Sequence, residues 1–289
     1  MKILVTGGSG FIGGHIVEKL NADGHDVTVM DVKAPLNKAS KFIKGDIVNK
    51  QDIERSVDNI DIIYHIAAFS NIDLVKDNPI KTIESNILGT AYLLEAARRK
   101  EVKRFIFASS VYVHDTRGHL YTTCKFASEM LCKNYYTLYG LPYTILRYGT
   151  AYGPRSRDAD VISIFIQKAL SNEEIVIHGS GNQKRNFVYV EDLALGSIAA
   201  MGKIGENKTY VIAGLESVSI KELVELLREA FSVELKIRID SKKERRDDYT
   251  GEIDGLMQTM IDLKWKPETS LSDGIKKARE YYLRSERIT

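Results

Sequence analysis

The stretch KILVTGGSGFIG, residues 2–13, decides the fold of this 289-residue chain. Its first half, Lys2 to Thr6, is an apolar, partly β-branched run that predicts a buried strand. An amphipathic pattern follows from about Phe11 to Asn21 and predicts a helix. A glycine-rich turn therefore connects a strand to a helix at the very start of the sequence, which is the setting of a dinucleotide-binding βαβ unit.

The glycines of this turn have the spacing that such a site requires. Gly8, Gly10 and Gly13 satisfy GxGxxG, and Gly7, Gly10 and Gly13 satisfy GxxGxxG. Glycine allows a tight turn and a close approach of backbone to a pyrophosphate, while the helix N-terminus offers N–H groups and a positive dipole to the anion. We therefore predict a nucleotide site here.

Outward from this stretch, short β-branched runs alternate with longer amphipathic ones, as in parallel sheets with helical crossovers. Right-handed crossovers place helices on both faces, so the fold class is α/β: a Rossmann-type, doubly wound parallel sheet. Further strands are expected at residues 26–30, 41–44, 61–65, 104–108 and 143–147, and helices at residues 80–99 and 121–138.

The rhythm changes after Tyr148, where prolines and glycines cluster and short strands mix with helices at residues 219–230 and 272–283. We expect a smaller C-terminal α+β substrate lobe there. The predicted division is a nucleotide-binding Rossmann domain at residues 1–149, to which residues 187–204 return, and a substrate-binding lobe at residues 150–289.

Composition excludes several classes of protein. Hydrophobic residues make up 44% and charged residues 28% of the chain, and 41 basic against 39 acidic residues give a net charge of +2. This balance is that of a globular protein and shows no nucleic-acid footprint. Residues 3–17 form the longest uncharged stretch, which is shorter than the about 20 residues of a membrane span.

Cys124 and Cys132 stand about 12 Å apart on one predicted helix, too far for a disulfide, so the cytoplasm is the expected compartment. No His/Cys/carboxylate cluster has the spacing of metal ligands.

The second predicted strand ends at Asp31, eighteen residues after Gly13. A carboxylate at this position accepts hydrogen bonds from the adenosine ribose hydroxyls and repels a 2′-phosphate, so NAD is favoured over NADP. Lys33 lies nearby and could soften this discrimination.

Three polar residues follow the strand predicted at residues 104–108. Ser110 comes just after its end, at the sheet edge where ligands bind, and Tyr121 and Lys125 form a YxxxK pair on one face of the next helix. A phenol with a pKa near 10 is a poor base, but an adjacent ammonium and a cationic nicotinamide lower that pKa toward the working range. Tyr121 would take the proton of a substrate alcohol, Ser110 would orient the alcohol, and Lys125 would supply the charge and hold the nicotinamide ribose.

These motifs resemble the extended short-chain dehydrogenase/reductase family, and within it the NAD-dependent nucleotide-sugar epimerase/dehydratase branch. The resemblance covers nearly the whole chain, and Ser110, Tyr121 and Lys125 match the family's catalytic residues. The cofactor-binding residues that it implies are Gly7, Gly10, Phe11, Ile12, Gly13, Asp31, Asp46, Ile47, Ala67, Ala68, Asn86, Tyr121, Lys125 and Tyr148.

The resemblance also implies substrate-binding residues. RNFVYVEDLA, residues 185–194, is similar to the stretch whose arginine grips the substrate diphosphate, which fits bidentate arginine–phosphate chemistry. The implied set is Thr150, Arg155, Arg185, Arg245 and Asp248. The family also implies a homodimer that pairs helices near residues 90–99 and 126–138.

Two departures from the family pattern bear on the substrate and the reaction. Only eleven positions separate Ser110 from Tyr121, fewer than in the usual epimerase loop. Val111 and Tyr112 stand where 4,6-dehydratases place an acidic pair, which disfavours dehydration.

The sequence therefore predicts an NAD-dependent nucleotide-sugar epimerase, most similar to UDP-glucose/galactose 4-epimerase, that works by transient oxidation to a keto-sugar. Two alternatives stay open at this point. One is an NAD-dependent dehydrogenase or reductase of a sugar or other small alcohol, and the other is a non-catalytic NAD(H)-binding regulator.

Overall fold

The computed structural model describes residues 1–36, 41–114, 119–158, 160–231, 234–241 and 253–286. The chain forms two compact units. The first comprises residues 1–148, 194–212 and 255–265, and the second comprises residues 149–193, 213–254 and 266–289.

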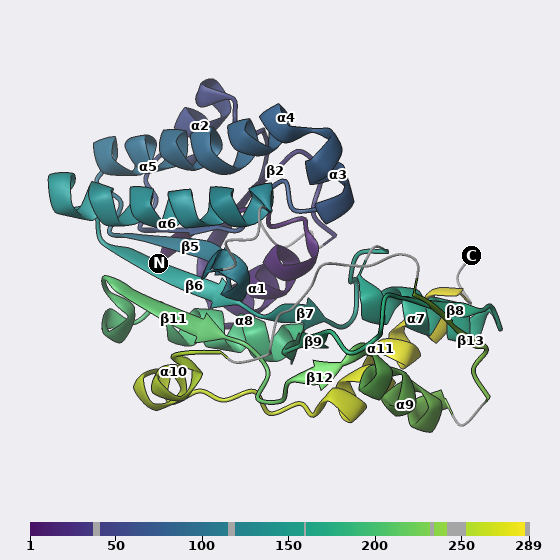
Figure 1. Ribbon diagram of the computed structural model, residues 1–289. Coiled ribbons are helices and arrows are strands. Elements are labelled where there is room, and N and C mark those ends of the chain that lie inside the picture. The colour runs from purple at the N-terminus through teal and green to yellow at the C-terminus, as the bar shows by residue number, and fades with distance from the viewer. Residues whose placement is uncertain (37–40, 115–118, 159, 232–233, 242–252, 287–289) are drawn as a thin grey trace. The chain divides into compact units, whose positions relative to one another are not determined.

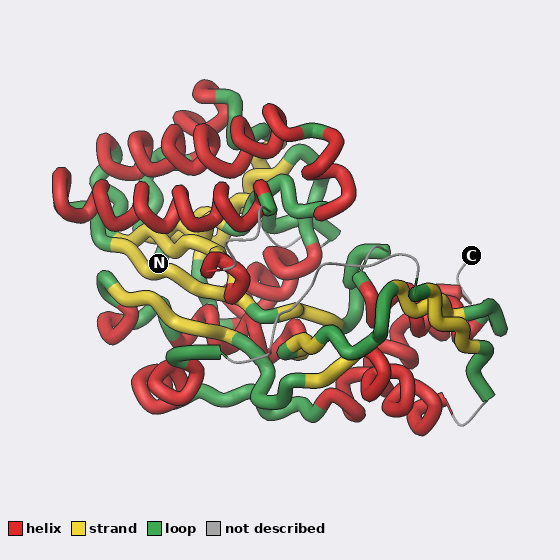
Figure 2. The backbone as a smooth tube through the Cα atoms, in the orientation of Figure 1, coloured by secondary structure: helices red, strands yellow, loops and turns green. Residues whose placement is uncertain are grey.

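A seven-stranded parallel sheet is the centre of the first unit (Figures 1 and 2). Its strand order is β11-β6-β5-β4-β1-β2-β3, so the order reverses direction between β1 and β4. The predicted doubly wound sheet is confirmed, and ligands of such sheets bind at the carboxyl edge near this reversal. The strands are β1 (Lys2–Thr6), β2 (Asp26–Asp31), β3 (Lys41–Lys44), β4 (Ile62–His65), β5 (Arg104–Ser110), β6 (Tyr143–Tyr148) and β11 (Lys208–Ile212).

Helices cover both faces of this sheet. Figure 1 shows α2, α5 and α6 on one face and α1 on the other. The core under α5 and α6 contains Leu93, Phe105 and Ile145, all inaccessible to solvent. The helices are α1 (Phe11–Ala22), α2 (Lys50–Ser56), α3 (Ile72–Asp77), α4 (Pro79–Ile83), the π-helix η1 (Glu84–Leu88), α5 (Gly89–Arg99), the 3₁₀-helix η2 (Val111–His114), α6 (Leu120–Tyr139), α8 (Val190–Ala199), which continues from the second unit, the 3₁₀-helix η3 (Lys203–Gly205) and α10 (Leu256–Leu263).

One predicted helix differs from the structure. Residues 80–99 form α4, η1 and α5 in succession rather than a single α-helix. The π-turn of η1 contains Asn86, whose side chain binds the backbone of Phe69. This contact with a distant loop accounts for a local irregularity that helical periodicity alone does not reveal.

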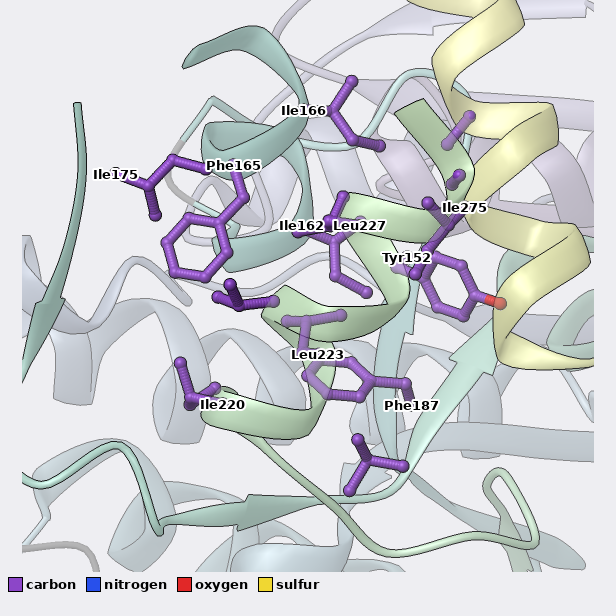
Figure 3. Packing of buried hydrophobic residues seen from close by; sticks show 14 of the residues in the cluster. Tyr152, Ile162, Phe165, Ile166, Ile175, Phe187, Ile220, Leu223, Leu227 and Ile275 are labelled. Carbon is purple, nitrogen blue, oxygen red and sulfur yellow. The ribbon is translucent and has the colours of Figure 1, made fainter. Parts of the chain in front are cut away.

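The second unit is built from short paired strands and helices around its own apolar core. Tyr152, Phe165, Phe187, Leu223 and Ile275 interdigitate there (Figure 3). Pairing joins β7 to β10, β9 to β12 and β8 to β13. The elements are β7 (Thr150–Tyr152), α7 (Val161–Leu170), β8 (Ile175–His178), β9 (Lys184–Arg185), β10 (Phe187–Tyr189), β12 (Val218–Ser219), α9 (Ile220–Phe231), β13 (Ile237–Asp240) and α11 (Leu271–Glu286).

None of the helices in the described ranges is both long and apolar enough to cross a bilayer.

Candidate active site

The glycine turn after β1 is so tight that side chains would not fit. Gly7 has φ +74°, and a Cβ there would lie 2.6 Å from the backbone nitrogen of Ala67. A Cβ on Gly13 would lie 2.2 Å from the carbonyl oxygen of Gly7. The turn is closed by a hydrogen bond from the Gly10 N–H to the Gly7 carbonyl, 3.0 Å long. Glycine is therefore required at both positions by the packing of turn against helix and neighbouring strand.

The N-terminus of α1 suits an anionic ligand. Its N-cap is Gly10, and among the described residues no side chain caps it and no acidic residue lies in its first turn. Phe11 and Ile12 begin the helix, and the Phe11 ring packs edge-on against His15, with ring centroids 6.0 Å apart. The first-turn N–H groups and the helix dipole thus fit the diphosphate of NAD.

Asp31 connects the end of β2 to the glycine turn. One carboxylate oxygen accepts from the Ser9 N–H at 3.1 Å and the other from the Lys33 N–H at 3.1 Å. The Ser9 hydroxyl in turn donates to the Lys33 carbonyl at 2.6 Å. A carboxylate has about four acceptor positions, so these two bonds leave acceptor capacity for ribose hydroxyls.

Asp46 and Ile47 follow β3 and have different surroundings. Asp46 is exposed and its Oδ1 accepts from the Val48 N–H at 3.2 Å, whereas Ile47 is buried. A Cβ on Gly89 would come within 3.1 Å of the Ile47 side chain. Ile47 therefore packs in the core beneath α5, and Asp46 is the member of the pair with a polar group at the surface.

A directional chain of hydrogen bonds holds His65 at the end of β4. The Thr90 hydroxyl donates to the Asn86 carbonyl at 2.7 Å, so it accepts from His65 Nε2 at 3.0 Å. His65 Nδ1 is then left to accept from the Thr6 hydroxyl at 2.8 Å. Burial, with a smaller contribution from Lys125, lowers the pKa of His65 to about 3. The imidazole is therefore a neutral crosslink between the ends of β1 and β4 and the helix α5.

Asn86 fixes the segment that follows His65. Its Oδ1 accepts from the Phe69 N–H at 2.8 Å and its Nδ2 donates to the Phe69 carbonyl at 3.0 Å, as a neighbouring strand would. The Ser128 hydroxyl donates to the Asn86 carbonyl at 2.8 Å and thereby connects this residue to α6. Ala67 and Ala68, two predicted cofactor residues, lie between these two anchors next to the glycine turn.

The three predicted catalytic residues gather at the same sheet edge as the glycine turn. Ser110 is the last residue of β5, and β4 alone separates β5 from β1, a spacing of about 10 Å. The Ser110 Oγ accepts from the Tyr112 N–H at 3.2 Å. Lys125 Nζ donates to the Ala108 carbonyl at 2.6 Å and lies 5.7 Å from the centre of the Tyr121 ring.

Lys125 is almost fully buried, and burial lowers its pKa to about 8. Its ammonium also lies 4.8 Å from the centre of the Phe107 ring, where the electron-rich face favours a cation. The side chain therefore carries its charge at neutral pH in a site that excludes water, next to the phenol of Tyr121.

Tyr148, predicted to bind cofactor, is buried at the end of β6. Its hydroxyl pairs with the Ser197 hydroxyl at 2.9 Å, and the Tyr64 hydroxyl donates to the Ser197 carbonyl at 3.2 Å. Burial raises the pKa of Tyr148 well above its usual range, so this phenol stays protonated.

The predicted substrate residues belong to the second unit or lie outside the described residues. Thr150 begins β7, and its N–H donates to the Asn186 carbonyl at 3.0 Å. Arg155 has the left-handed φ of +65°, and Arg185 lies on β9, where its guanidinium donates to the Lys184 carbonyl at 2.7 Å. Arg245 and Asp248 fall in the range 242–252, outside the described residues.

Sequence reasoning missed a buried ionic cluster beside the predicted catalytic residues. Glu129 on α6 is inaccessible to solvent and accepts from the Ser109 hydroxyl at 2.6 Å. It also accepts from Arg147 Nε at 2.9 Å and Nη2 at 2.7 Å. The available signal was its position one helical turn after Lys125, on the same face of α6.

Comparisons with known proteins identify the family of this chain. A model of the NAD dependent epimerase/dehydratase family matches residues 3–213. The crystal structure of UDP-glucose 4-epimerase from Thermotoga maritima with UDP-glucose has a TM-score of 0.90 and 31% sequence identity, covering 99% of this chain and 100% of that one. UDP-glucuronic acid 4-epimerase from Bacillus cereus, solved with UDP-glucuronic acid and NAD, has a TM-score of 0.88 and 28% identity over 99% and 100% of the two chains.

Relatives with another reaction are also similar. UDP-N-acetyl-alpha-D-glucosaminuronate decarboxylase from Bacillus cytotoxicus is 34% identical over 253 residues, 78% of each chain. The relatives of this chain thus include both epimerases and a decarboxylase. The chain belongs to the NAD-dependent epimerase/dehydratase family, as its motifs predicted.

Proposed function

We propose that the protein is an NAD-dependent nucleotide-sugar epimerase that inverts the C4 carbon of a UDP-hexose. The observation that carries this proposal is the buried Lys125 ammonium, 5.7 Å from the centre of the Tyr121 ring at the sheet edge where Ser110 ends β5. A cation beside a phenol favours the phenolate, which is the base that an alcohol oxidation needs.

In this mechanism Tyr121 removes the proton of the 4-hydroxyl group while the Ser110 hydroxyl orients the same oxygen. Gly7, Gly10, Gly13 and Asp31 would hold NAD, which would supply the hydride acceptor and donor that oxidation and reduction at C4 require. Tyr121 then gives the proton back to the C4 oxygen. The positive charge of Lys125 stabilises the phenolate form of Tyr121. Because the reaction causes no net redox change, the cofactor recycles without release.

The residues after Ser110 support epimerisation over dehydration. Val111 and Tyr112 begin η2 directly after β5, so these two positions hold no carboxyl group that could serve as the acid or base in eliminating water from a sugar. Elimination needs a second pair of proton carriers beyond the tyrosine. An enzyme that only oxidises and reduces C4 with NAD needs no proton carrier beyond Tyr121.

For the substrate we propose that Arg185 binds the diphosphate, that Thr150 and Arg155 belong to the same substrate site, and that Arg245 and Asp248 bind near the nucleotide. The support is chemical: a planar guanidinium matches phosphate oxygens in a bidentate way that an ammonium does not. Arg185→Lys is then expected to raise the KM for UDP-sugar about tenfold with a smaller change in kcat. A variant in which kcat alone falls would assign Arg185 to another role.

We also propose a homodimer through α5 and α6. Phe126 and Met130 on α6 stand one turn apart and are 44% and 40% exposed, and Leu138 further along is 68% exposed. Large apolar side chains at such positions are typical of a buried interface. Phe126→Glu is expected to convert the dimer to a monomer in sedimentation equilibrium, and a wild-type monomer would contradict the proposal.

The cytoplasm is the compartment that we propose. Cys124 and Cys132 are both buried free thiols on α6. Burial raises the pKa of both thiols, so neither is activated for oxidation. Reduced, unpaired cysteines are usual in a reducing compartment.

The test of the function is to incubate the purified chain, with NAD at enzyme concentration, separately with UDP-glucose, UDP-galactose, UDP-N-acetylglucosamine and UDP-glucuronate. Nuclear magnetic resonance should show the C4 epimer of one of them accumulating without free NADH. Stoichiometric NADH would instead identify a dehydrogenase or reductase, and a UDP-pentose with carbon dioxide would identify a decarboxylase. NAD binding with no turnover of any sugar would leave a cofactor-binding regulator.

A further inference from the structure

Glu129 lies at the centre of a cluster that connects one helix to two strands. Its carboxylate receives one hydrogen bond from the Ser109 hydroxyl and two from the Arg147 guanidinium, at 2.6, 2.9 and 2.7 Å. Taking a carboxylate out of water is costly unless it is paired and hydrogen-bonded. The three hydrogen bonds meet this requirement, and they fix the position of α6 along the strands β5 and β6.

The partners of Glu129 are direct neighbours of the reaction site. Ser109 precedes Ser110 on β5, and Ser109 stands opposite Arg147 in the parallel pairing of β5 with β6. Lys125 Nζ binds the carbonyl of Ala108, the residue before Ser109, at 2.6 Å. Helix α6 is therefore attached to consecutive residues of one strand end by two of its own side chains, one turn apart.

This attachment decides where Tyr121 lies. Tyr121, Lys125 and Glu129 are spaced by four residues along α6, so they share one helix face. A rotation or slide of α6 against β5 would move the phenol and the ammonium together, away from Ser110. The bidentate bond with Arg147 resists both movements, because a fork of two parallel hydrogen bonds fixes direction as well as distance.

The cluster also sets the electrostatic surroundings of the Lys125 ammonium. Among the described residues, the titratable groups that face it are Tyr121, Cys124, Cys132 and Glu129 on its own helix and His65 on β4. Arg147 of β6 lies behind Glu129. Burial keeps both thiols protonated and His65 neutral at working pH. Glu129 is then the carboxylate in this set, and it raises the pKa of Lys125, which burial lowers to about 8.

We propose that Glu129 is a positioning residue of the epimerase reaction: it fixes the helix that carries Tyr121 and Lys125 to the strand ends at Ser110, and it supplies negative charge to the Lys125 ammonium. The proposal rests on the proposed function for its kinetic consequences. Its electrostatic consequence holds for the protein without any substrate.

The experiment compares Glu129→Gln, Glu129→Asp and Glu225→Gln in the full chain. Glutamine keeps the length of the side chain and an acceptor for Ser109 but loses the charge. We expect Glu129→Gln to lower kcat by about tenfold to a hundredfold with NAD affinity and KM changed less than about threefold. The alkaline limb of its kcat profile should move to lower pH, because Lys125 then loses its proton sooner.

The two other variants separate charge from position. Aspartate keeps the charge but is one methylene shorter, so kcat should fall while the alkaline limb stays at the wild-type pH. Glu225 on α9 forms a similar ion pair with Arg228, at 2.7 Å, but is largely exposed, so Glu225→Gln should leave kcat and its pH profile unchanged.

A second measurement does not depend on the enzymatic activity. The Lys125 side chain is followed by ¹³C nuclear magnetic resonance of ¹³Cε-lysine in the protein without substrate, with assignment from Lys125→Arg. The wild-type midpoint is expected near 8, and the midpoint in Glu129→Gln should be lower. If no UDP-sugar is epimerised but this midpoint moves, the proposed function fails and the electrostatic part of this proposal stands.

Ser109→Ala covers the case in which Glu129→Gln does not fold. It removes one of the three hydrogen bonds and leaves the charge, so kcat should fall severalfold while the Lys125 midpoint stays in place. An unmoved midpoint together with wild-type kcat in Glu129→Gln would overturn the proposal. If Glu129→Gln instead lowered stability, NAD affinity and kcat together and left the pH profile unchanged, Glu129 would have only a folding role, and the proposal would be overturned.

Discussion

The glycine turn after β1 and the strand end at Ser110 lie on the same sheet edge but are built in different ways. The turn is made by backbone: Gly7 and Gly13 matter because a Cβ on either would meet a backbone atom at 2.6 or 2.2 Å. The edge at Ser110 is made by side chains that come from separate parts of the chain. Glu129 meets Ser109 across 20 residues and Arg147 across 18.

This difference separates cofactor binding from chemistry. Backbone N–H groups at a helix start bind an anion through their geometry, so cofactor binding depends on the glycines that permit the turn and not on the charge state of a side chain. Proton transfer instead depends on the charge state and placement of Tyr121 and Lys125, which their buried neighbours control. Variants of the two regions should therefore fail in different assays.

The largest expected effect is on the chemical side of the comparison. Tyr121→Phe removes the proposed base, and kcat should fall by about a thousandfold or more, within the range known for general base removal. NAD affinity, measured by calorimetric titration, should stay near the wild-type value because the glycine turn is untouched. Wild-type turnover in this variant would eliminate Tyr121 as the base.

Changes in the glycine turn should instead affect stability and NAD affinity. Gly13→Ala forces a Cβ against the Gly7 carbonyl and should lower the free energy of unfolding by about 1–3 kcal/mol, with a loss of NAD affinity. Gly10→Ala is the matched control for stability, since its Cβ would lie 3.2 Å from the same oxygen, and should cost less. Equal unfolding free energies for the two variants, measured in urea, would contradict the close packing described here.

His65 makes the stability of the first unit depend on pH. Its pKa is about 3 in the folded protein against the usual 6.5, so the unfolded chain binds the extra proton between these values. The contribution of His65 is complete above pH 6.5 and is lost as pH falls, by about 1.4 kcal/mol per pH unit at most. Urea unfolding of wild type and His65→Asn at pH 7, 6, 5 and 4 should give a steeper decline for wild type, and parallel declines would reject this account.

The smallest expected effect concerns the choice of cofactor. Asp31→Arg replaces the carboxylate that repels a 2′-phosphate with a group that binds one, so the ratio of NADP to NAD affinity should rise by about tenfold. Equilibrium titration with each cofactor measures it directly. An unchanged ratio would show that Asp31 serves only to anchor Ser9 and Lys33.

Much of the first unit could be predicted because its signals are local. The runs that form β1 to β6 are short, apolar and separated by turns, and the predicted bounds agree with the observed strands to within two residues. The break of the predicted helix at η1 could not be foreseen, since it depends on Asn86 reaching the backbone of Phe69, 17 residues away. The two-residue strands β9 and β12 of the second unit likewise exist only through their pairing.

By itself, the sequence determined the alternation of parallel strands and helices in the first unit, the glycine turn and the Tyr121–Lys125 spacing, because each depends on residues within a few positions of one another. Only the tertiary structure decided that Glu129 joins Ser109 and Arg147, and that His65 is a neutral crosslink. The reason is that burial and pairing are properties of side chains brought together from different elements. A linear pattern records which groups are present, whereas their charge states follow from what surrounds them in space.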